Sequence, residues 1–245
     1  MCLSILCENA RAQTDIYILA GQSNMAGMAP LGGEPSPQNQ GRLMMLVTNT
    51  GAWVQAKDPT NAYPNTGVGP TLWFADRMAA LMPDRTIGIV NCAKGGTYLA
   101  DWMPDYMTRS LYGNMLWHAR QAKAYGTIKG FLWYQGEAET VDRENVLLYT
   151  RRMHALFSAI RQDLGIPDLP IVFVQLGPGP NDYSRPYWRD IQLRQQYIDD
   201  AQPDGIAMVS ASDLQTISAT NYHLNQQSQI ILGGRLADMM YQIMP

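Results

Sequence analysis

Short apolar segments alternate along the chain with longer segments in which apolar residues recur at helical spacing. Several of the short segments are apolar throughout, which is typical of strands covered on both faces. Proline or glycine follows several of the longer segments and marks where helices end. The pattern predicts strands at 16–20, 43–47, 86–91, 128–134, 171–175 and 206–209, and helices at 71–81, 111–125, 145–164, 188–199 and 226–243.

This alternation predicts an α/β fold, a three-layer α/β/α sandwich built on a mostly parallel sheet. Right-handed crossovers place the carboxyl ends of such strands along one edge, where open α/β sheets bind ligands. The stretches 30–41 and 58–70 are rich in Gly, Pro and Asn, and we expect them to be loops. Both follow the first strand region, and long loops are often functional, so they are candidates to rim a site there.

The composition is that of a globular protein and excludes several classes of function. The chain has 245 residues, of which 46% are hydrophobic and 16% are charged, with a formal net charge of -3. No basic stripe is visible, so we expect no nucleic-acid partner and no membrane partner. The apolar runs are too short to span a bilayer. Residues 13–245 are expected to form a single domain without a linker.

The first twelve residues allow two interpretations. Residues 2–7 (CLSILC) are apolar, and Ala10-Arg11-Ala12 has the small-x-small form of a signal-peptide cleavage site. A signal-peptide remnant at 1–12 implies a secreted or periplasmic protein, whereas the alternative is a frayed N-terminus. After removal of this segment only Cys92 remains, which makes no intrachain disulfide and is expected to be an inert core residue.

A serine motif follows the first predicted strand directly, with the sequence Gly21-Gln22-Ser23-Asn24-Met25. A serine at a strand-to-helix turn presents its hydroxyl at the sheet edge and aims its backbone N–H at developing negative charge. The alternative is that Ser23 only caps the helix. Met25 stands where the Gly-x-Ser-x-Gly elbow has its second glycine, which argues against an α/β-hydrolase arrangement.

Two further motifs also stand at strand ends. Gly95 and Gly96 follow the strand at 86–91 and leave backbone N–H groups open to a ligand, although the order of residues is not that of a phosphate-binding loop. Gln135 and Glu137 follow the strand at 128–134 and offer a side-chain amide and a carboxylate. The alternatives are a plain tight turn for the glycines and a structural role for the two side chains.

The last candidate is a histidine just before the final helix. His223 lies in a predicted loop, from which it can reach the sheet edge. The other two histidines, His118 and His154, fall inside predicted helices, where histidine is usually structural or solvated. Elimination therefore singles out His223 as the candidate histidine. The alternative is that it has no function, as is more often true of a single loop histidine.

Together these blocks resemble the SGNH hydrolases, and more narrowly the sialate O-acetylesterase and acetylxylan esterase-like group that includes the sixth carbohydrate-esterase family. The resemblance runs from about Asp15 to the final helix. It implies a flavodoxin-like sheet and ester hydrolysis without a metal or other cofactor. Carried over by position, Ser23 is the nucleophile and His223 the general base. The implied oxyanion hole consists of the Ser23 N–H, a glycine N–H and a side-chain amide, supplied by Ser23, Gly95 or Gly96, and Gln135.

One position departs from the family pattern. Members typically carry Asp three residues before the histidine, and here that residue is Thr220. A neutral threonine cannot stabilise the imidazolium that forms during catalysis. We expect Glu137 to serve as the acid, with Asp213 as the alternative, and Glu139 to be solvated.

The resemblance implies an acetylated saccharide as substrate, with acetylxylan and sialate-type esters both open. Among the aromatic residues of the predicted loops, Trp102 and Tyr98 are candidates to stack on a sugar ring, together with Trp188 and Tyr183. Two alternative functions remain: an SGNH lipase or arylesterase acting on longer acyl esters, and a catalytically impaired homologue that binds carbohydrate.

Overall fold

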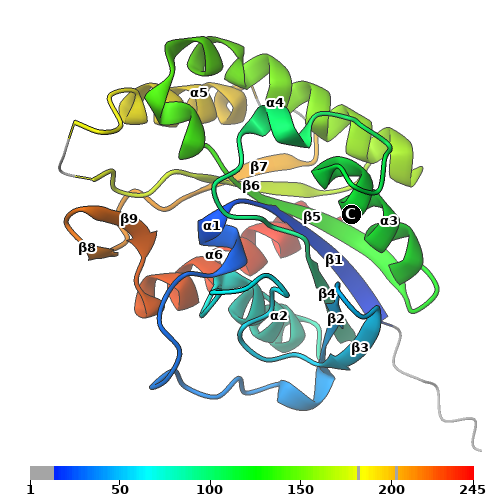
Figure 1. The fold of residues 1–245 in the computed structure, drawn as a ribbon. Coiled ribbons are helices and arrows are strands. Elements are labelled where there is room, and N and C mark those ends of the chain that lie inside the picture. Colours follow the sequence, from blue (N-terminus) through cyan, green and yellow to red (C-terminus); the bar gives the residue numbers. More distant parts are fainter. Residues whose placement is uncertain (1–13, 181–182, 202–203) are drawn as a thin grey trace, which may run out of the picture.

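A seven-stranded sheet forms the centre of the computed structural model (Figure 1), which describes residues 14–180, 183–201 and 204–245. The segment 1–12, interpreted above as a signal-peptide remnant, lies outside the described residues. The strands are β1 (Thr14–Gly21), β2 (Leu43–Val47), β3 (Ala52–Gln55), β4 (Thr86–Asn91), β5 (Thr127–Tyr134), β6 (Ile171–Gln175) and β7 (Ile206–Ser210).

The strands follow the order β3-β2-β4-β1-β5-β6-β7, and all neighbours pair in parallel except β3, which runs antiparallel to β2. The expected mostly parallel sheet is thus confirmed. The register places Leu19 of β1 opposite both Asn91 of β4 and Leu132 of β5. The carboxyl ends of these three central strands therefore lie side by side, and all three strand-end motifs meet at one edge.

Helices cover both faces of the sheet, which gives the expected three layers (Figure 1). On one face α2 and α6 pack against each other, and α3, α4 and α5 cover the other face. Helix α4 buries apolar residues three or four positions apart and ends at Gly165, whose φ of 67° suits the left-handed cap. The helices are α2 (Pro70–Leu81), α3 (Leu111–Ala122), α4 (Arg143–Leu164), α5 (Trp188–Asp200) and α6 (Gln226–Ile243).

The structure contains several short elements that the sequence pattern did not predict. Strand β3 is a mostly exposed edge strand, so it lacks a continuous apolar run. The hairpin of β8 (Thr216–Ser218) and β9 (Asn221–Leu224) replaces the loop that was expected around His223, and that expectation was wrong. The remaining short elements are the one-turn helix α1 (Ser23–Ala26) and the 3-10 helices η1 (Gln40–Arg42), η2 (Leu99–Trp102) and η3 (Ala138–Val141).

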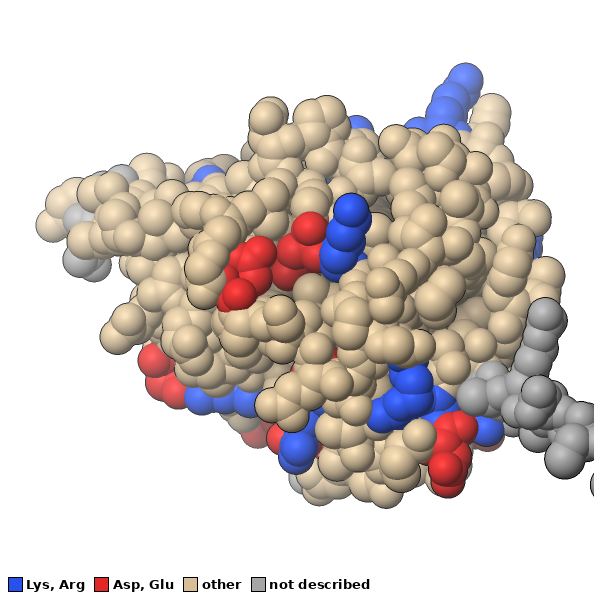
Figure 2. All heavy atoms as spheres, turned by 90° about the horizontal axis from the view of Figure 1, so that it is seen from below, with Lys and Arg blue, Asp and Glu red and all other residues tan. Residues whose placement is uncertain are grey.

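The core and the surface agree with the composition. Cys92 is 7% exposed, and burial raises the pKa of its thiol to about 12, so the thiol stays protonated as expected of an inert core residue. On the face shown in Figure 2, acidic and basic side chains lie in small mixed groups separated by uncharged surface. Among the described helices, none combines the length and apolar character needed to cross a bilayer.

Candidate active site

The serine motif sits on a tight turn between β1 and α1. Gly21 has a φ of 131°, and a Cβ atom there would lie 2.1 Å from the carbonyl oxygen of Tyr134. The absence of a side chain therefore allows the ends of β1 and β5 to approach, and the Gln22 N–H donates to the same carbonyl at 2.9 Å. The next residue, Ser23, is 5% exposed and begins α1.

The structure brings His223 onto this serine across 200 residues of sequence. The Nε2 atom of His223 lies 2.9 Å from Ser23 Oγ, and the backbone N–H of His223 donates to Asn221 Oδ1 at 2.9 Å. Burial lowers the pKa of His223, and the positive charge of Arg185 lowers it further. The imidazole is therefore neutral at neutral pH and can accept a proton through Nε2.

Asn24 links the serine turn to the strand that carries the histidine. Its Nδ2 donates to Glu137 Oε1 at 2.9 Å and to the Tyr222 carbonyl at 3.3 Å, while its Oδ1 accepts from the Leu224 N–H at 2.9 Å. These bonds hold β9 on both sides of His223. The position of Asn24 beside the serine was the one sign in the sequence that this residue belongs to the site. Its contacts with β9 could not be predicted from the sequence.

The Gly95 and Gly96 turn lies beside the serine. A Cβ atom on Gly95 would lie 3.6 Å from the Ser23 Cβ, so this close neighbour is compatible with ordinary packing. Neither glycine N–H, nor that of Ser23, donates to an acceptor within the described residues. The serine turn and the neighbouring glycine turn therefore carry three backbone N–H groups that are unpaired among the described residues and free to donate to a ligand.

These groups line one pocket with a volume of about 390 Å³. Its lining includes the serine, the histidine and the glycine pair, together with part of the loop at 58–70, which was expected to border the site. The lining residues are Ser23, Ala26, Met28, Tyr63, Pro64, Asn65, Thr66, Lys94, Gly95, Gly96, Tyr222 and His223.

Gln135, expected as a side-chain oxyanion donor, lies outside this pocket and is fully buried. Its Nε2 donates to the Glu139 carboxylate and to the Thr97 carbonyl, the latter at 3.2 Å. The amide therefore fastens η3 to the segment after the glycine pair. The expectation that Glu139 is solvated was wrong, because this amide and the Leu99 N–H both donate to the buried carboxylate.

Glu137 and Asp213, the two candidate acids, lie in opposite environments. Glu137 is fully buried, and this burial raises the pKa of its carboxyl to about 7. One oxygen accepts from Asn24, and the other has no hydrogen-bond partner among the described residues. Asp213 pairs with Arg235 through two bonds of 2.7 Å at the surface, which lowers the pKa of Asp213 to about 2.

No described carboxylate makes a hydrogen bond with the His223 imidazole. Thr220 lies in the exposed turn of the hairpin, with its hydroxyl 3.5 Å from that of Ser218. Arg185 is the charged residue that sequence reasoning missed. It stands 4.4 Å over the Tyr222 ring and donates to the Glu137 carbonyl, so it joins the acid segment to the histidine strand.

The aromatic residues expected to bind sugar lie elsewhere. Trp102 is fully buried, donates to Thr97 Oγ1 at 3.0 Å and packs edge-on against Trp133, so its ring is part of the core. Tyr98 is 38% exposed but does not line the serine pocket. The aromatic residues that do line it are Tyr63 and Tyr222, which no local motif marked.

Residues 13–242 match the family model for carbohydrate esterase, sialic acid-specific acetylesterase. Among known proteins, a probable carbohydrate esterase of Arabidopsis thaliana is 29% identical over 242 residues. That similarity covers 91% of this chain and 88% of the relative.

Solved structures share the fold over nearly the whole chain. A protein from Arabidopsis thaliana superposes with a TM-score of 0.82 at 27% identity, covering 95% of this chain and 100% of that chain. A carbohydrate acetylesterase from Xanthomonas citri gives 0.70 at 23% identity, covering 94% of this chain and 56% of that one. NanS gives 0.68 at 16% identity, with coverage of 94% and 97%. The chain belongs to the sialic acid-specific acetylesterase family of carbohydrate esterases, which are carboxylic ester hydrolases.

Proposed function

We propose that the chain removes O-acetyl groups from carbohydrate through an acyl-serine intermediate, with Ser23 as nucleophile and His223 as general base. The observation that carries this proposal is the 2.9 Å contact between Ser23 Oγ and His223 Nε2 in an open pocket. This distance lies within the range in which a base removes a proton from a nucleophile.

The first half of the reaction transfers the acetyl group to the enzyme. His223 Nε2 takes the hydroxyl proton as Ser23 Oγ forms a bond to the ester carbonyl carbon. The carbonyl π electrons move to oxygen, and this oxyanion accepts from the unpaired N–H groups of Ser23, Gly95 and Gly96. When the C–O bond to the sugar breaks, the imidazolium returns its proton to the sugar oxygen.

The second half releases acetate. His223 removes a proton from water as the water oxygen attacks the acyl carbon. The tetrahedral intermediate rests on the same N–H groups, and its collapse gives acetate while the proton passes to Ser23 Oγ. Each oxyanion donor contributes about 3 kcal/mol when well aimed.

We assign the buried polar residues to positioning rather than to contact with substrate. Glu137 acts on His223 through Asn24, since Asn24 bonds to the carboxylate and to the backbone on either side of the histidine. Gln135 holds the segment after the glycine pair through the Thr97 carbonyl. Asp213 is occupied by Arg235 at the surface, which favours Glu137 over Asp213 as the carboxylate coupled to the site.

The acetylated sugar is proposed from the family and from the pocket. Lys94 lines the pocket, with its ammonium group 5.5 Å from the centre of the Tyr63 ring. A cation at this position favours an anionic sugar such as an O-acetylated sialic acid, whereas an acetylated xylose would leave it unpaired. Lys94→Met should therefore raise KM for O-acetylated sialic acid and leave KM for acetylated xylose unchanged.

Acetate release tests the reaction itself. We expect hydrolysis of p-nitrophenyl acetate and of an acetylated saccharide, with Ser23→Ala and His223→Ala each lowering kcat by about 10⁶-fold. Activity close to that of the wild type in Ser23→Ala would refute the mechanism. A preference for p-nitrophenyl octanoate over acetate would favour a lipase, and glycan binding without acetate release would favour an impaired carbohydrate-binding homologue.

A further inference from the structure

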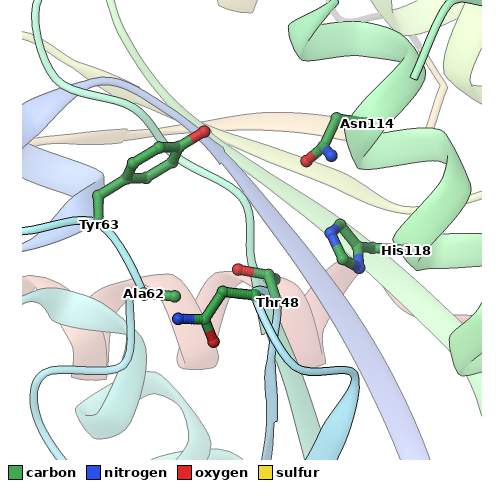
Figure 3. A pocket seen from close by; sticks show the side chains of 6 residues that line it. Thr48, Ala62, Tyr63, Asn114 and His118 are labelled. Carbon is green, nitrogen blue, oxygen red and sulfur yellow. The ribbon is translucent and has the colours of Figure 1, made fainter. Parts of the chain in front are cut away.

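A second cavity adjoins the active-site pocket and shares Tyr63 with it. Its volume is about 180 Å³, and it lies between the turn after β2, the loop before α2, and helix α3 (Figure 3). Figure 3 shows Asn114 and His118 on the helix facing Tyr63 and Thr48 across the hollow. The lining residues are Thr48, Asn49, Ala62, Tyr63, Asn114 and His118.

The polar side chains of this cavity are not engaged with the protein. The hydroxyl of Thr48 and the amides of Asn49 and Asn114 make no hydrogen bond with any described group. His118 is 3% exposed, and its Nδ1 is buried without a partner. Of these side chains only His118 is buried, since Thr48 and Asn114 are half-buried and Asn49 is exposed. Buried polar groups of folded proteins are nearly always paired, so the unpaired Nδ1 of His118, beside a cavity lined by open polar side chains, indicates a ligand or ordered water.

A nearby asparagine, unlike the polar side chains of the cavity, has its hydrogen-bonding groups paired within the protein. Asn61 lies in the same loop as Tyr63 and is also buried, but its amide donates to Asn91 Oδ1 at 3.1 Å and to the Ala93 carbonyl at 2.8 Å. Its Oδ1 accepts from the Tyr63 N–H at 2.9 Å. The loop is thereby fixed to the end of β4, and the Tyr63 backbone is held between the two hollows.

The ring of Tyr63 lies partly open on this fixed backbone, with Lys94 Nζ 5.5 Å from its centre. The residue is 40% exposed and borders both the active-site pocket and the second cavity. A ligand that starts at Ser23 and extends past this ring therefore enters the second cavity. Aromatic rings at such positions offer an apolar face to the C–H side of a sugar while the hydroxyls remain free to bond elsewhere.

We propose that this cavity is a second saccharide subsite, which binds the uncharged sugar unit next to the acetylated unit held at Ser23. The inference rests on the proposed function. Amides, a hydroxyl and an imidazole supply donors and acceptors together, as vicinal sugar hydroxyls require. Burial lowers the pKa of His118, so its ring is neutral, and none of the described Lys, Arg, Asp and Glu residues lines the cavity.

The size of the cavity limits what it binds. Its volume is far above the ~10–15 Å³ that a single water needs and below the about 300–1,000 Å³ of pockets for drug-sized ligands. One sugar ring fits this range, and an extended chain does not. The subsite is expected to recognise a single unit and leave the rest of a longer saccharide in solvent.

The test compares an acetylated monosaccharide with the same acetylated unit linked to one neutral hexose or pentose. Two pairs are used: O-acetylated sialic acid with its galactose-linked form, and acetylated xylose with acetylated xylobiose. We expect kcat/KM of the wild type to be at least about tenfold higher for the linked substrate, as two or more added hydrogen bonds allow. Equal values for both members of each hydrolysed pair would overturn the proposal.

The variants are Asn114→Leu and Thr48→Val, which remove polar atoms from the cavity while keeping the number and branching of side-chain heavy atoms, and Gln121→Ala, which changes the exposed side of the same helix. The first two should reduce the preference for the linked substrate by about fivefold or more, and the third should leave the preference unchanged. An equal loss on linked and unlinked substrates in the cavity variants would contradict the subsite.

A binding measurement separates this proposal from the proposed function. Deacetylated galactose-linked sialic acid and xylobiose are titrated calorimetrically into Ser23→Ala and into Ser23→Ala with Asn114→Leu. Binding of either sugar that is weakened by the second substitution supports the subsite even if the wild type releases no acetate. Binding that Asn114→Leu leaves unchanged, or no binding of either sugar, refutes the subsite, while acetate release continues to test the reaction separately.

Discussion

Replacing Asn24 with leucine tests whether this residue positions the histidine. Leucine has the same number and branching of side-chain heavy atoms as asparagine but makes none of its side-chain hydrogen bonds. Besides a long bond of 3.5 Å from Gln229 Nε2, the variant loses three closer bonds, to Glu137 Oε1, the Tyr222 carbonyl and the Leu224 N–H. At about 1 kcal/mol each, their loss lowers the free energy of unfolding by about 3 kcal/mol.

The effect on catalysis follows from geometry. Without the bonds on either side of His223, β9 is free to shift relative to Ser23, and a displacement of about 1 Å costs about 100-fold in rate. Asn24 is 1% exposed and does not line the pocket, so KM should change little. We therefore expect kcat for p-nitrophenyl acetate to fall about 100-fold at nearly constant KM.

A second variant and a control separate positioning from stability alone. Asn24→Asp keeps an acceptor for the Leu224 N–H but places a second carboxylate against Glu137, so its stability should rise as the pH falls below 7 and Glu137 becomes protonated. Asn39→Leu removes a comparable clamp, to Asp76 and Arg42, away from the site. If Asn24→Leu and Asn39→Leu lose similar stability and both keep kcat within about fivefold, Asn24 is structural and the reasoning fails.

Four further predictions concern charge and backbone. Burial raises the pKa of Glu137 from 4.5 to about 7, so the free energy of unfolding should fall by about 3 kcal/mol between these pH values, and Glu137→Gln should abolish that slope in urea titrations. Because the pKa of His223 is lowered from 6.5, kcat/KM should rise with pH along a limb centred below 6.5; a limb centred above 7 would contradict a neutral base. Asp213→Asn should change kcat/KM by less than about twofold, since its surface ion pair stands apart from the site, and a 100-fold loss would make Asp213 the acid. Gly21→Ala should lower the melting temperature severely because its Cβ would meet a carbonyl oxygen at 2.1 Å, whereas Gly41→Ala, with open space around it, should not.

The central sheet was predictable because its strands are buried on both faces. Residues 16–20 are apolar throughout and 0% exposed, and the segments at β4, β5 and β6 follow the same rule. Helix ends were marked by chain breakers, as at Gly165. Strand β3 and the β8–β9 hairpin escaped prediction because they are short and partly exposed, so neither leaves a continuous apolar run.

For the candidate site, the sequence predicted that motifs at the ends of different strands lie close together. Parallel strands in register bring the residues after β1, β4 and β5 together, so motifs far apart in sequence become neighbours. The contacts of Asn24 and Arg185 were not predictable, because each depends on the position of a hairpin that has no local signal. Trp102 and Glu139 show the same limit: whether a loop residue is exposed depends on which distant groups pack against it or donate to it.

No described carboxylate makes a hydrogen bond with the His223 imidazole, and the catalytic cost of this can be compared with the stabilisation that the oxyanion donors would supply. Loss of a triad acid costs about 10⁴-fold in kcat, which corresponds to about 5 kcal/mol. The backbone N–H groups of Ser23, Gly95 and Gly96 have no acceptors among the described residues, and two well-aimed donors supply about 6 kcal/mol. In the proposed mechanism these donors stabilise the oxyanion by an amount comparable to the cost of a missing triad acid, but they do not stabilise the imidazolium. Burial and Arg185 both disfavour the imidazolium, so we expect proton transfer to His223 to limit kcat and slow acetyl transfer to Ser23 to be the main consequence.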